Sequence, residues 1–165
     1  MGTSSETKLN VEPSKQIITI EREFDVNRNI VFDAFTDAEL FAQWMGPSRL
    51  SLKLETFEPY NGGSWKYVNQ DEFGTSYVFR GVFHEVTKPE RIIQTFEYEG
   101  LPERGHVKLE TWTFEELSGG CTRIVMESVF RSVEDRDNML RSGMEEGVME
   151  SFDRLTLLLG KLKSN

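Results

Sequence analysis

The chain ends in SVEDRDNMLRSGMEEGVMESFDRLTLLLGKLKSN, residues 132–165, a stretch with the period of an amphipathic helix. One stripe of side chains recurs at three- and four-residue intervals and therefore shares one helix face. The stripe consists of Leu140, Met144, Val148, Ser151, Phe152, Leu155, Leu159 and Leu162. Ser132 suits the N-cap, and Lys161 and Lys163 suit the negative C-terminal end. The sequence therefore predicts one long C-terminal helix that begins at Ser132.

Two glycines, Gly143 and Gly147, lie four residues apart inside this helical pattern. A glycine in a helix interior costs up to about 1 kcal/mol relative to alanine. Such a residue is explained either by the close approach of another backbone or by room that is needed beside the helix. The sequence leaves both explanations open.

Before this helix the chain alternates apolar and polar residues in strand after strand. Six such segments are separated by turn residues, and they cover 49–57, 64–70, 75–86, 91–99, 106–117 and 121–130. Their connections are short, whereas parallel strands need long crossovers. The sequence therefore predicts six antiparallel strands in a row.

A seventh strand and two short helices precede them. Residues 16–26, QIITIEREFDV, alternate with one polar face. Asn27 can cap a first helix, and Thr36 with Glu39 fits the capping box of a second. Gly46 can end that helix in the left-handed conformation, and the following proline cannot continue it. We expect two short helices between residues 27 and 46.

Length and composition limit the function classes. The 165 residues suit one domain, which we expect over 16–163, after a disordered polar tail over 1–15. The formal charge of -9 repels nucleic acid and anionic lipid, and no apolar run is long enough to span a membrane. The single Cys121 cannot form an internal disulfide. A cytoplasmic protein with no nucleic-acid or membrane partner is expected.

These elements predict an α+β fold in which a curved seven-stranded antiparallel sheet wraps around the C-terminal helix, in the order β-α-α-β6-α. This order resembles the helix-grip fold of the START and birch-pollen-allergen superfamily. Within it, five stretches look like the homologues of the activator of the heat-shock-protein-90 ATPase. They are FDAFTDAELFAQWMGP, GGSWKY, RGVFHEVTKPERIIQTFEYE, ETWTFEELSGGCTRI and SGMEEGVMESFDRL. The resemblance covers residues 16–162.

The resemblance implies a cavity between the sheet and the helix. It also implies three functions, which the sequence leaves open: binding of a small apolar or aromatic molecule, an enzyme of the polyketide cyclase and aromatase type, or a co-chaperone. We favour ligand binding, because no catalytic signature is present and no surface patch for a chaperone is identified. The family usually has two tryptophans where this chain has Trp44 and Met45, so ligand preference is expected to differ.

Strand alternation assigns side chains to the inward face of the sheet. The inward sets comprise Trp65 and Tyr67; Gln94, Phe96 and Tyr98; Glu110, Trp112 and Phe114; and Ile124, Met126 and Ser128. Trp44 and Met45 are expected to close one end as a lid. The predicted ligand-binding residues are Trp44, Met45, Trp65, Tyr67, Phe96, Tyr98, Glu110, Trp112, Met126, Met144, Val148 and Phe152. Ordinary core packing is the alternative for each of them.

Glu110 is the most informative of these residues, because a buried carboxylate needs a partner or a ligand. It could bind a ligand donor or act as a general base, or a shifted register could leave it in solvent beside Lys108 or Arg123. We expect His106 to be exposed and His84 to be a satisfied sheet histidine. No metal site, cofactor or nucleophile is predicted, and Glu145, Glu146 and Glu150 are expected on a solvated face. Val78, Val82 and Val86 would permit a homodimer contact.

Overall fold

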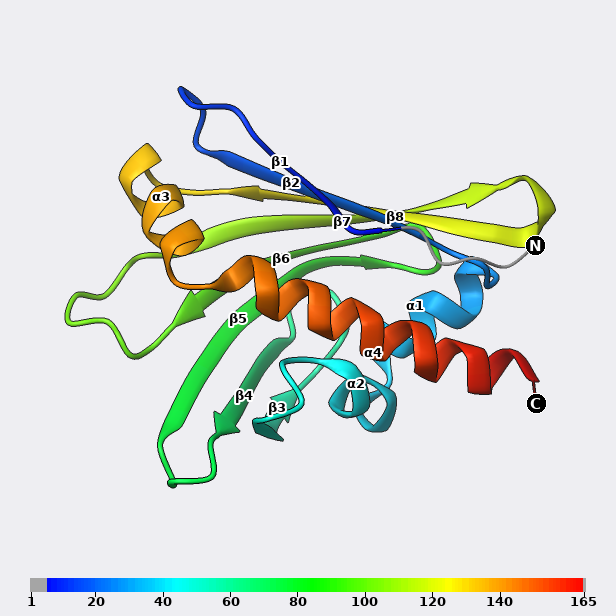
Figure 1. The fold of residues 1–165 in the computed structure, drawn as a ribbon, viewed down its shortest axis with the longest axis horizontal. Coiled ribbons are helices and arrows are strands. Elements are labelled where there is room, and N and C mark those ends of the chain that lie inside the picture. Colours follow the sequence, from blue (N-terminus) through cyan, green and yellow to red (C-terminus); the bar gives the residue numbers. More distant parts are fainter. Residues whose placement is uncertain (1–5, 165) are drawn as a thin grey trace.

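The computed structural model describes residues 6–164 and has the α+β helix-grip fold (Figure 1). The helices are α1 (Arg28–Thr36), α2 (Ala38–Trp44), α3 (Val133–Arg141) and α4 (Met144–Ser164), with a short 3-10 turn, η1 (Ser118–Gly120). The strands are β1 (Lys8–Val11), β2 (Ile17–Phe24), β3 (Ser51–Phe57), β4 (Ser64–Gln70), β5 (Ser76–Thr87), β6 (Arg91–Tyr98), β7 (Lys108–Leu117) and β8 (Cys121–Val129).

All eight strands form one antiparallel sheet in the order β1-β2-β8-β7-β6-β5-β4-β3. The seven predicted strands are confirmed, because each is found close to its expected bounds. Burial alternates along β2, β4 and β8, as period-2 side chains require when one face is packed. In Figure 1 the sheet curves and α4 crosses its concave face.

The eighth strand corrects the predicted N-terminal tail. Lys8–Val11 pairs with β2, from Lys8 opposite Glu21 to Val11 opposite Ile18. The buried Arg136 of α3 donates to the carbonyls of Glu12, Pro13 and Lys15 in the connecting turn. The predicted disordered tail over 1–15 is therefore wrong for residues 8–11. These residues form a strand because they pair with the otherwise unpaired edge of β2. Residues 1–5 lie outside the described residues. A single domain over 16–163 stays a prediction.

The helix caps are partly as predicted. Asn27 caps α1 by accepting a hydrogen bond from the backbone N–H of Asn29. The capping box at Thr36 is wrong, because Thr36 is the last residue of α1 and its hydroxyl donates to the carbonyl of Phe32. Asp37 caps α2 instead, and its carboxylate accepts from the N–H of Leu40 at 3.1 Å. A carboxylate suits the positive end of the helix better than a hydroxyl does.

The single C-terminal helix is also corrected. Ser132 caps α3 as predicted, by accepting from the N–H of Asp135. The helix then ends at Arg141, and a second helix begins at Met144. Gly143 between them has φ of +87°, a left-handed conformation that only glycine adopts at little cost. This break separates α3 from the helix that lies on the sheet.

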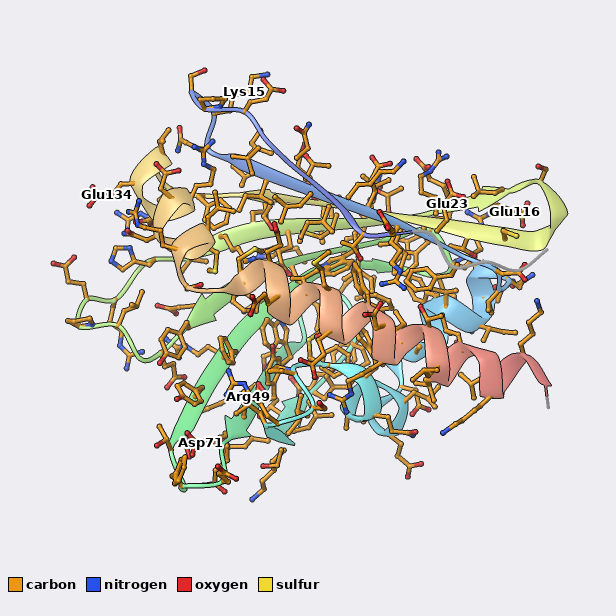
Figure 2. The ribbon with its side chains drawn as sticks, in the orientation of Figure 1. Lys15, Glu23, Arg49, Asp71, Glu116 and Glu134 are labelled. Carbon is orange, nitrogen blue, oxygen red and sulfur yellow. The ribbon has the colours of Figure 1, made fainter. Side chains whose placement is uncertain are left out.

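The core lies between the concave face and α4 from Ser151 onward, where α1 and α2 also pack (Figure 1). Phe152, Leu155 and Leu159 are at most 2% exposed. The ring of Phe152 meets those of Phe24 and Trp112 at centroid distances of 6.0 and 6.2 Å. Figure 2 shows side chains crowded between α4 and the strands, with charged residues such as Lys15 and Glu134 at the periphery. No described helix is long and apolar enough to cross a membrane.

Candidate functional site

A buried polar network lies on the concave face, on adjacent strands β6 and β7. Gln94 and Glu110 are opposite each other in register, and the amide nitrogen Nε2 of Gln94 donates to Oε1 of Glu110 at 2.9 Å. The indole Nε1 of Trp112 donates to the same oxygen at 3.2 Å. The ammonium of Lys108 lies 3.0 Å from Oε2. Glu110 is 3% exposed, so the prediction that it faces inward is confirmed.

Lys108 is a member of this network that the sequence reasoning missed. Its side chain is 6% exposed, with the ammonium 4.6 Å from the ring centre of Phe96 and 5.5 Å from that of Phe130. The ammonium also lies 3.5 Å from the hydroxyl of Ser128. Aromatic faces stabilise a cation. Lys108 lies two residues before Glu110 on β7, so strand alternation places both side chains on the same face of the sheet. This alternation is the sequence signal that identifies Lys108 as a member of the network.

Aromatic rings on β4, β5 and β6 continue from the network through Phe96, which lies beside Lys108. Trp65 and Tyr67 stack with centroids 5.5 Å apart, and Phe96 lies 5.6 Å from Trp65. Tyr98 lies 5.2 Å from Phe79, a residue absent from the predicted set. Burial, and then the charge of Glu110, raise the pKa of the Tyr67 hydroxyl, which therefore stays protonated. These rings make an apolar wall with a neutral phenol in it.

Trp65 and Asn69, both on β4, each have a buried nitrogen with no hydrogen-bond partner among residues 6–164, Nε1 and Nδ2 respectively. Arg22 Nε is likewise buried and has no hydrogen-bond partner among the same residues. The indole of Trp65 lies against the backbone of Gly81, where an added Cβ would come within 2.6 Å of Nε1. Buried donors without a partner are uncommon.

Trp44 is a core residue, which corrects the predicted lid. Its side chain is fully buried, and its Nε1 donates to the carbonyl of Ala34 at 2.8 Å. Its ring packs against Phe35, Phe41 and Phe152. A buried indole with a satisfied N–H fills space rather than closing a hole. Met45 is half-buried at the end of α2 and contacts the core.

The end of α2 is fastened to the middle of α4. The N–H of Gly46 donates to Ser151 Oγ at 2.9 Å, and Arg154 donates to the carbonyl of Gly46 at 2.7 Å. The carboxylate of Glu150 accepts from the hydroxyl of Ser48 at 2.6 Å. Glu150, expected on a solvated face, is half-buried because the loop after α2 folds back onto it, although its hydrogen bonds to Ser48 stay exposed. Glu145 and Glu146 are exposed as predicted.

The first turns of α4, before Ser151, cover the sheet less completely. Met144, Gly147 and Val148 are half-buried, whereas Phe152 one turn later is 2% exposed. An added Cβ at Gly147 would meet no atom within 4 Å. Close backbone packing therefore does not explain Gly147, and open space lies beside the helix at that point. Met126, also predicted for the site, is 3% exposed and lies opposite Trp112 in the sheet.

The direction of β7 relative to α4 places the buried polar network near the start of the helix. In Figure 1, α4 and β7 run in the same direction. The ring of Trp112 contacts that of Phe152. Glu110 and Lys108 precede Trp112 on β7 by two and four residues, so they lie progressively closer to the start of α4. One turn before Phe152 on the helix is Val148. Val148 and Met144 therefore lie on the side of the buried network.

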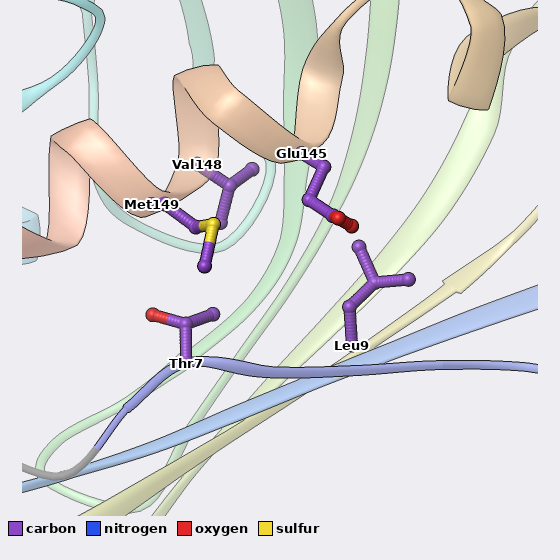
Figure 3. Close-up of a pocket in the computed structure, with 5 residues that line it drawn as sticks. All are labelled: Thr7, Leu9, Glu145, Val148 and Met149. Atoms are coloured by element: carbon purple, nitrogen blue, oxygen red, sulfur yellow. The ribbon is translucent and has the colours of Figure 1, made fainter.

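A small pocket of about 110 Å³ opens beside the same helical segment. It is lined by Thr7, Leu9, Glu145, Val148 and Met149, and Figure 3 shows β1 on one side and the first turns of α4 on the other. Of the predicted residues, only Val148 lines it. Strand β1, in the segment expected to be a tail, thus contributes Leu9 to one wall of this pocket.

The two histidines differ from expectation. His106 is 30% exposed, and its Nδ1 lies 3.0 Å from both carboxylate oxygens of Asp135. This hydrogen bond raises the pKa of His106, against a smaller opposing effect of desolvation. His84, expected to be satisfied within the sheet, is exposed. Within residues 6–164, no group of three or more His, Cys, Asp or Glu side chains could hold a metal ion.

Comparison with known families decides the classification. The family described as Activator of Hsp90 ATPase homolog 1-like protein matches residues 25–160, which span α1 through most of α4. The chain belongs to this family. Its fold is compatible with ligand binding, and a fold does not by itself assign an activity. No curated protein matches the chain.

Solved structures share this fold. A protein from Rhodobacter sphaeroides is 22% identical with a TM-score of 0.85, over 95% of this chain and 99% of that one. A protein from Staphylococcus epidermidis is 27% identical with a TM-score of 0.77, over 92% and 94%. The AHSA1 protein from Silicibacter pomeroyi is 24% identical with a TM-score of 0.72, over 87% and 97%. The helix-grip prediction is confirmed.

Proposed function

We propose that this protein binds a small apolar or aromatic molecule between the concave face of the sheet and the N-terminal half of α4. The observation that carries this proposal is the uneven cover of the sheet. Helix residues Phe152, Leu155 and Leu159 are buried, whereas Met144, Gly147 and Val148 are only half-buried. On β5 and β6, Phe79, Phe96 and Tyr98 are also half-buried and keep part of their surface accessible.

The chemistry of the surrounding residues supports this. Ligand sites are mostly apolar and contain a few polar groups held in fixed positions. Here the apolar part is supplied by aromatic rings and two helix side chains, and the polar part by the network around Glu110. Because Lys108 and Glu110 neutralise each other, the site suits an uncharged molecule.

The enzyme alternative depends on Glu110 as a general base. Three donors, from Lys108, Gln94 and Trp112, already engage its two oxygens. Such a carboxylate favours a structural role over proton transfer, because accepting a substrate proton would break these contacts. The chaperone activity in the family description depends on a surface contact, and no described residue of this chain identifies one.

A thermal-shift experiment tests the proposal. Fatty acids, flavonoids and fused-ring aromatic compounds are added in turn, and a bound compound raises the melting temperature by mass action. Val148→Trp places a large ring in the space beside α4 and should abolish the shift. Leu157→Trp, on the exposed face of the same helix, should retain it. A shift that is unchanged in Val148→Trp, or no shift with any compound, would argue against this site.

A further inference from the structure

Gln94 is the polar side chain of the network that is not fully enclosed. It projects from β6 to the concave face, since it is in register with the buried Glu110 and its neighbours Ile93 and Thr95 point to the other face. Unlike Lys108 and Glu110, whose side chains are 6% and 5% exposed, Gln94 is only half-buried. Its accessible surface therefore faces the proposed ligand site.

The orientation of its amide is fixed by chemistry. Glu110 is paired with the ammonium of Lys108 at 3.0 Å, and an ionised carboxylate can only accept hydrogen bonds. The Gln94 atom that lies 2.9 Å from Glu110 Oε1 must therefore be the nitrogen. The amide oxygen occupies the other branch of the side chain, and no hydrogen bond to it is found among residues 6–164. Gln94 thus presents an acceptor.

The same network disfavours an anionic ligand. The positive charge of Lys108 is already matched by Glu110, and its remaining surroundings include the rings of Phe96 and Phe130. A ligand carboxylate would have to share this cation with Glu110 at close range, and like charges in a buried site repel strongly. A neutral hydrogen-bond donor meets Gln94 without this repulsion.

The walls near Gln94 are aromatic. Phe96 follows on the same face of β6, and Phe79 lies 5.5 Å from it. Offset stacking against such rings favours a flat aromatic ligand. An aryl alcohol combines the two features that these residues select, namely an aromatic ring and a neutral O–H donor.

We propose that Gln94 is the specificity-determining residue of this site and that the ligand is a neutral aromatic molecule whose hydroxyl donates to the Gln94 amide oxygen. This inference rests on the proposed function, because it concerns the same site. Glu110 and Lys108 then act as positioning residues, since they hold the amide in one orientation and do not touch the ligand.

Three probes of nearly equal size test the proposal: 2-naphthol, its methyl ether and 2-naphthoate. Dissociation constants are measured by calorimetry with the full chain. We expect 2-naphthol to bind about five- to tenfold more tightly than the ether, the effect of one hydrogen bond to the half-buried Gln94 acceptor. We expect 2-naphthoate to bind more weakly than 2-naphthol. A purely apolar cavity would instead prefer the ether.

A matched pair of variants assigns the preference to Gln94. Gln94→Met keeps the length of the side chain and leaves Glu110 with Lys108 and Trp112, so the preference for 2-naphthol over the ether should disappear. Gln43→Met changes an exposed glutamine of α2 and should keep it. The preference for 2-naphthol over the ether is also measured on the wild-type protein, so the proposal is tested even if Gln94→Met unfolds.

The outcomes separate the two proposals. If the ether or 2-naphthoate binds as tightly as 2-naphthol, the role of Gln94 is wrong while a ligand site remains. If Gln94→Met keeps the preference for 2-naphthol, another residue accepts the hydrogen bond from the hydroxyl and this inference is overturned. If none of the three probes binds and the broader compound panel also gives no thermal shift, both proposals fail.

Discussion

Lys108 and Glu110 form an ion pair of 3.0 Å in which both side chains are almost fully buried, at 6% and 5% exposure. Removal of one partner leaves an uncompensated buried charge, which costs about 3–5 kcal/mol. We therefore expect Lys108→Met to lower the free energy of unfolding by about this amount. Urea denaturation of the variant and the wild type measures the difference.

A surface pair with the same geometry supplies the control. Lys15 and Glu12 also lie 3.0 Å apart, but both side chains are 57% exposed. Lys15→Met should cost less than about 1 kcal/mol, because solvent screens the pair. The double variant Lys108→Met with Glu110→Leu should be more stable than Lys108→Met alone, since no charge is then left unpaired. Equal losses for Lys15→Met and Lys108→Met would contradict the importance of burial.

Replacement by alanine should change the stability of the protein in opposite directions at Gly147 and at Gly81. At Gly147 an added Cβ meets nothing within 4 Å, so Gly147→Ala should stabilise α4 by up to about 1 kcal/mol. At Gly81 the same atom would lie 2.0 Å from the carbonyl oxygen of Thr95, and Gly81→Ala should destabilise by about 1–3 kcal/mol. Thermal unfolding of both variants checks the pair. A loss of stability in Gly147→Ala would show that the space beside α4 is not available.

The contact between His106 and Asp135 should make stability depend on pH. Asp135 raises the pKa of His106 through their hydrogen bond. The folded pKa thus exceeds the unfolded value of about 6.5, so the contribution is fully present below that pH and is lost as pH rises through the folded pKa. The stability difference between wild type and His106→Gln should therefore shrink from pH 5.5 to pH 9. In Asp135→Asn the effect of His106→Gln should lose this pH dependence, and a difference that grows with pH would refute the assignment.

Arg136 should hold the N-terminal hairpin in place. Its guanidinium donates to three carbonyls of the turn between β1 and β2, and hydrogen bonds from charged groups contribute about 1.5–3 kcal/mol each. Arg136→Met should expose the peptide bond after Lys15 and speed tryptic cleavage there by about tenfold or more. Arg141→Met, whose side chain is exposed and bonds only to Asn138 among the described residues, should not. Mass spectrometry of a cleavage time course distinguishes them.

Local pattern was sufficient for much of the fold and for part of the site. The alternation through Glu110, Trp112 and Phe114 predicted their inward face, because a one-residue change of register would have turned all three into solvent. The same rule places Lys108 inward, but a lysine is expected at the surface, and only the pairing with Glu110 explains its burial. The role of Ser132 as a cap was predictable because it depends on neighbours within three residues.

Features that depend on distant contacts were beyond the sequence. Residues 8–11 have a strand pattern too short to identify, and they become β1 because the edge of β2 is free and Arg136 fixes the turn. Trp44 fits equally well in a core or at a cavity, and the backbone carbonyl of Ala34 with three packed rings places it in the core. The amino-acid order alone thus established seven of the eight strands, the curved sheet and the inward face of residues such as Glu110, since these follow from periodicity and turns. Only the tertiary structure decided which of those residues close the interior and which leave room, because that depends on where α4 meets the sheet.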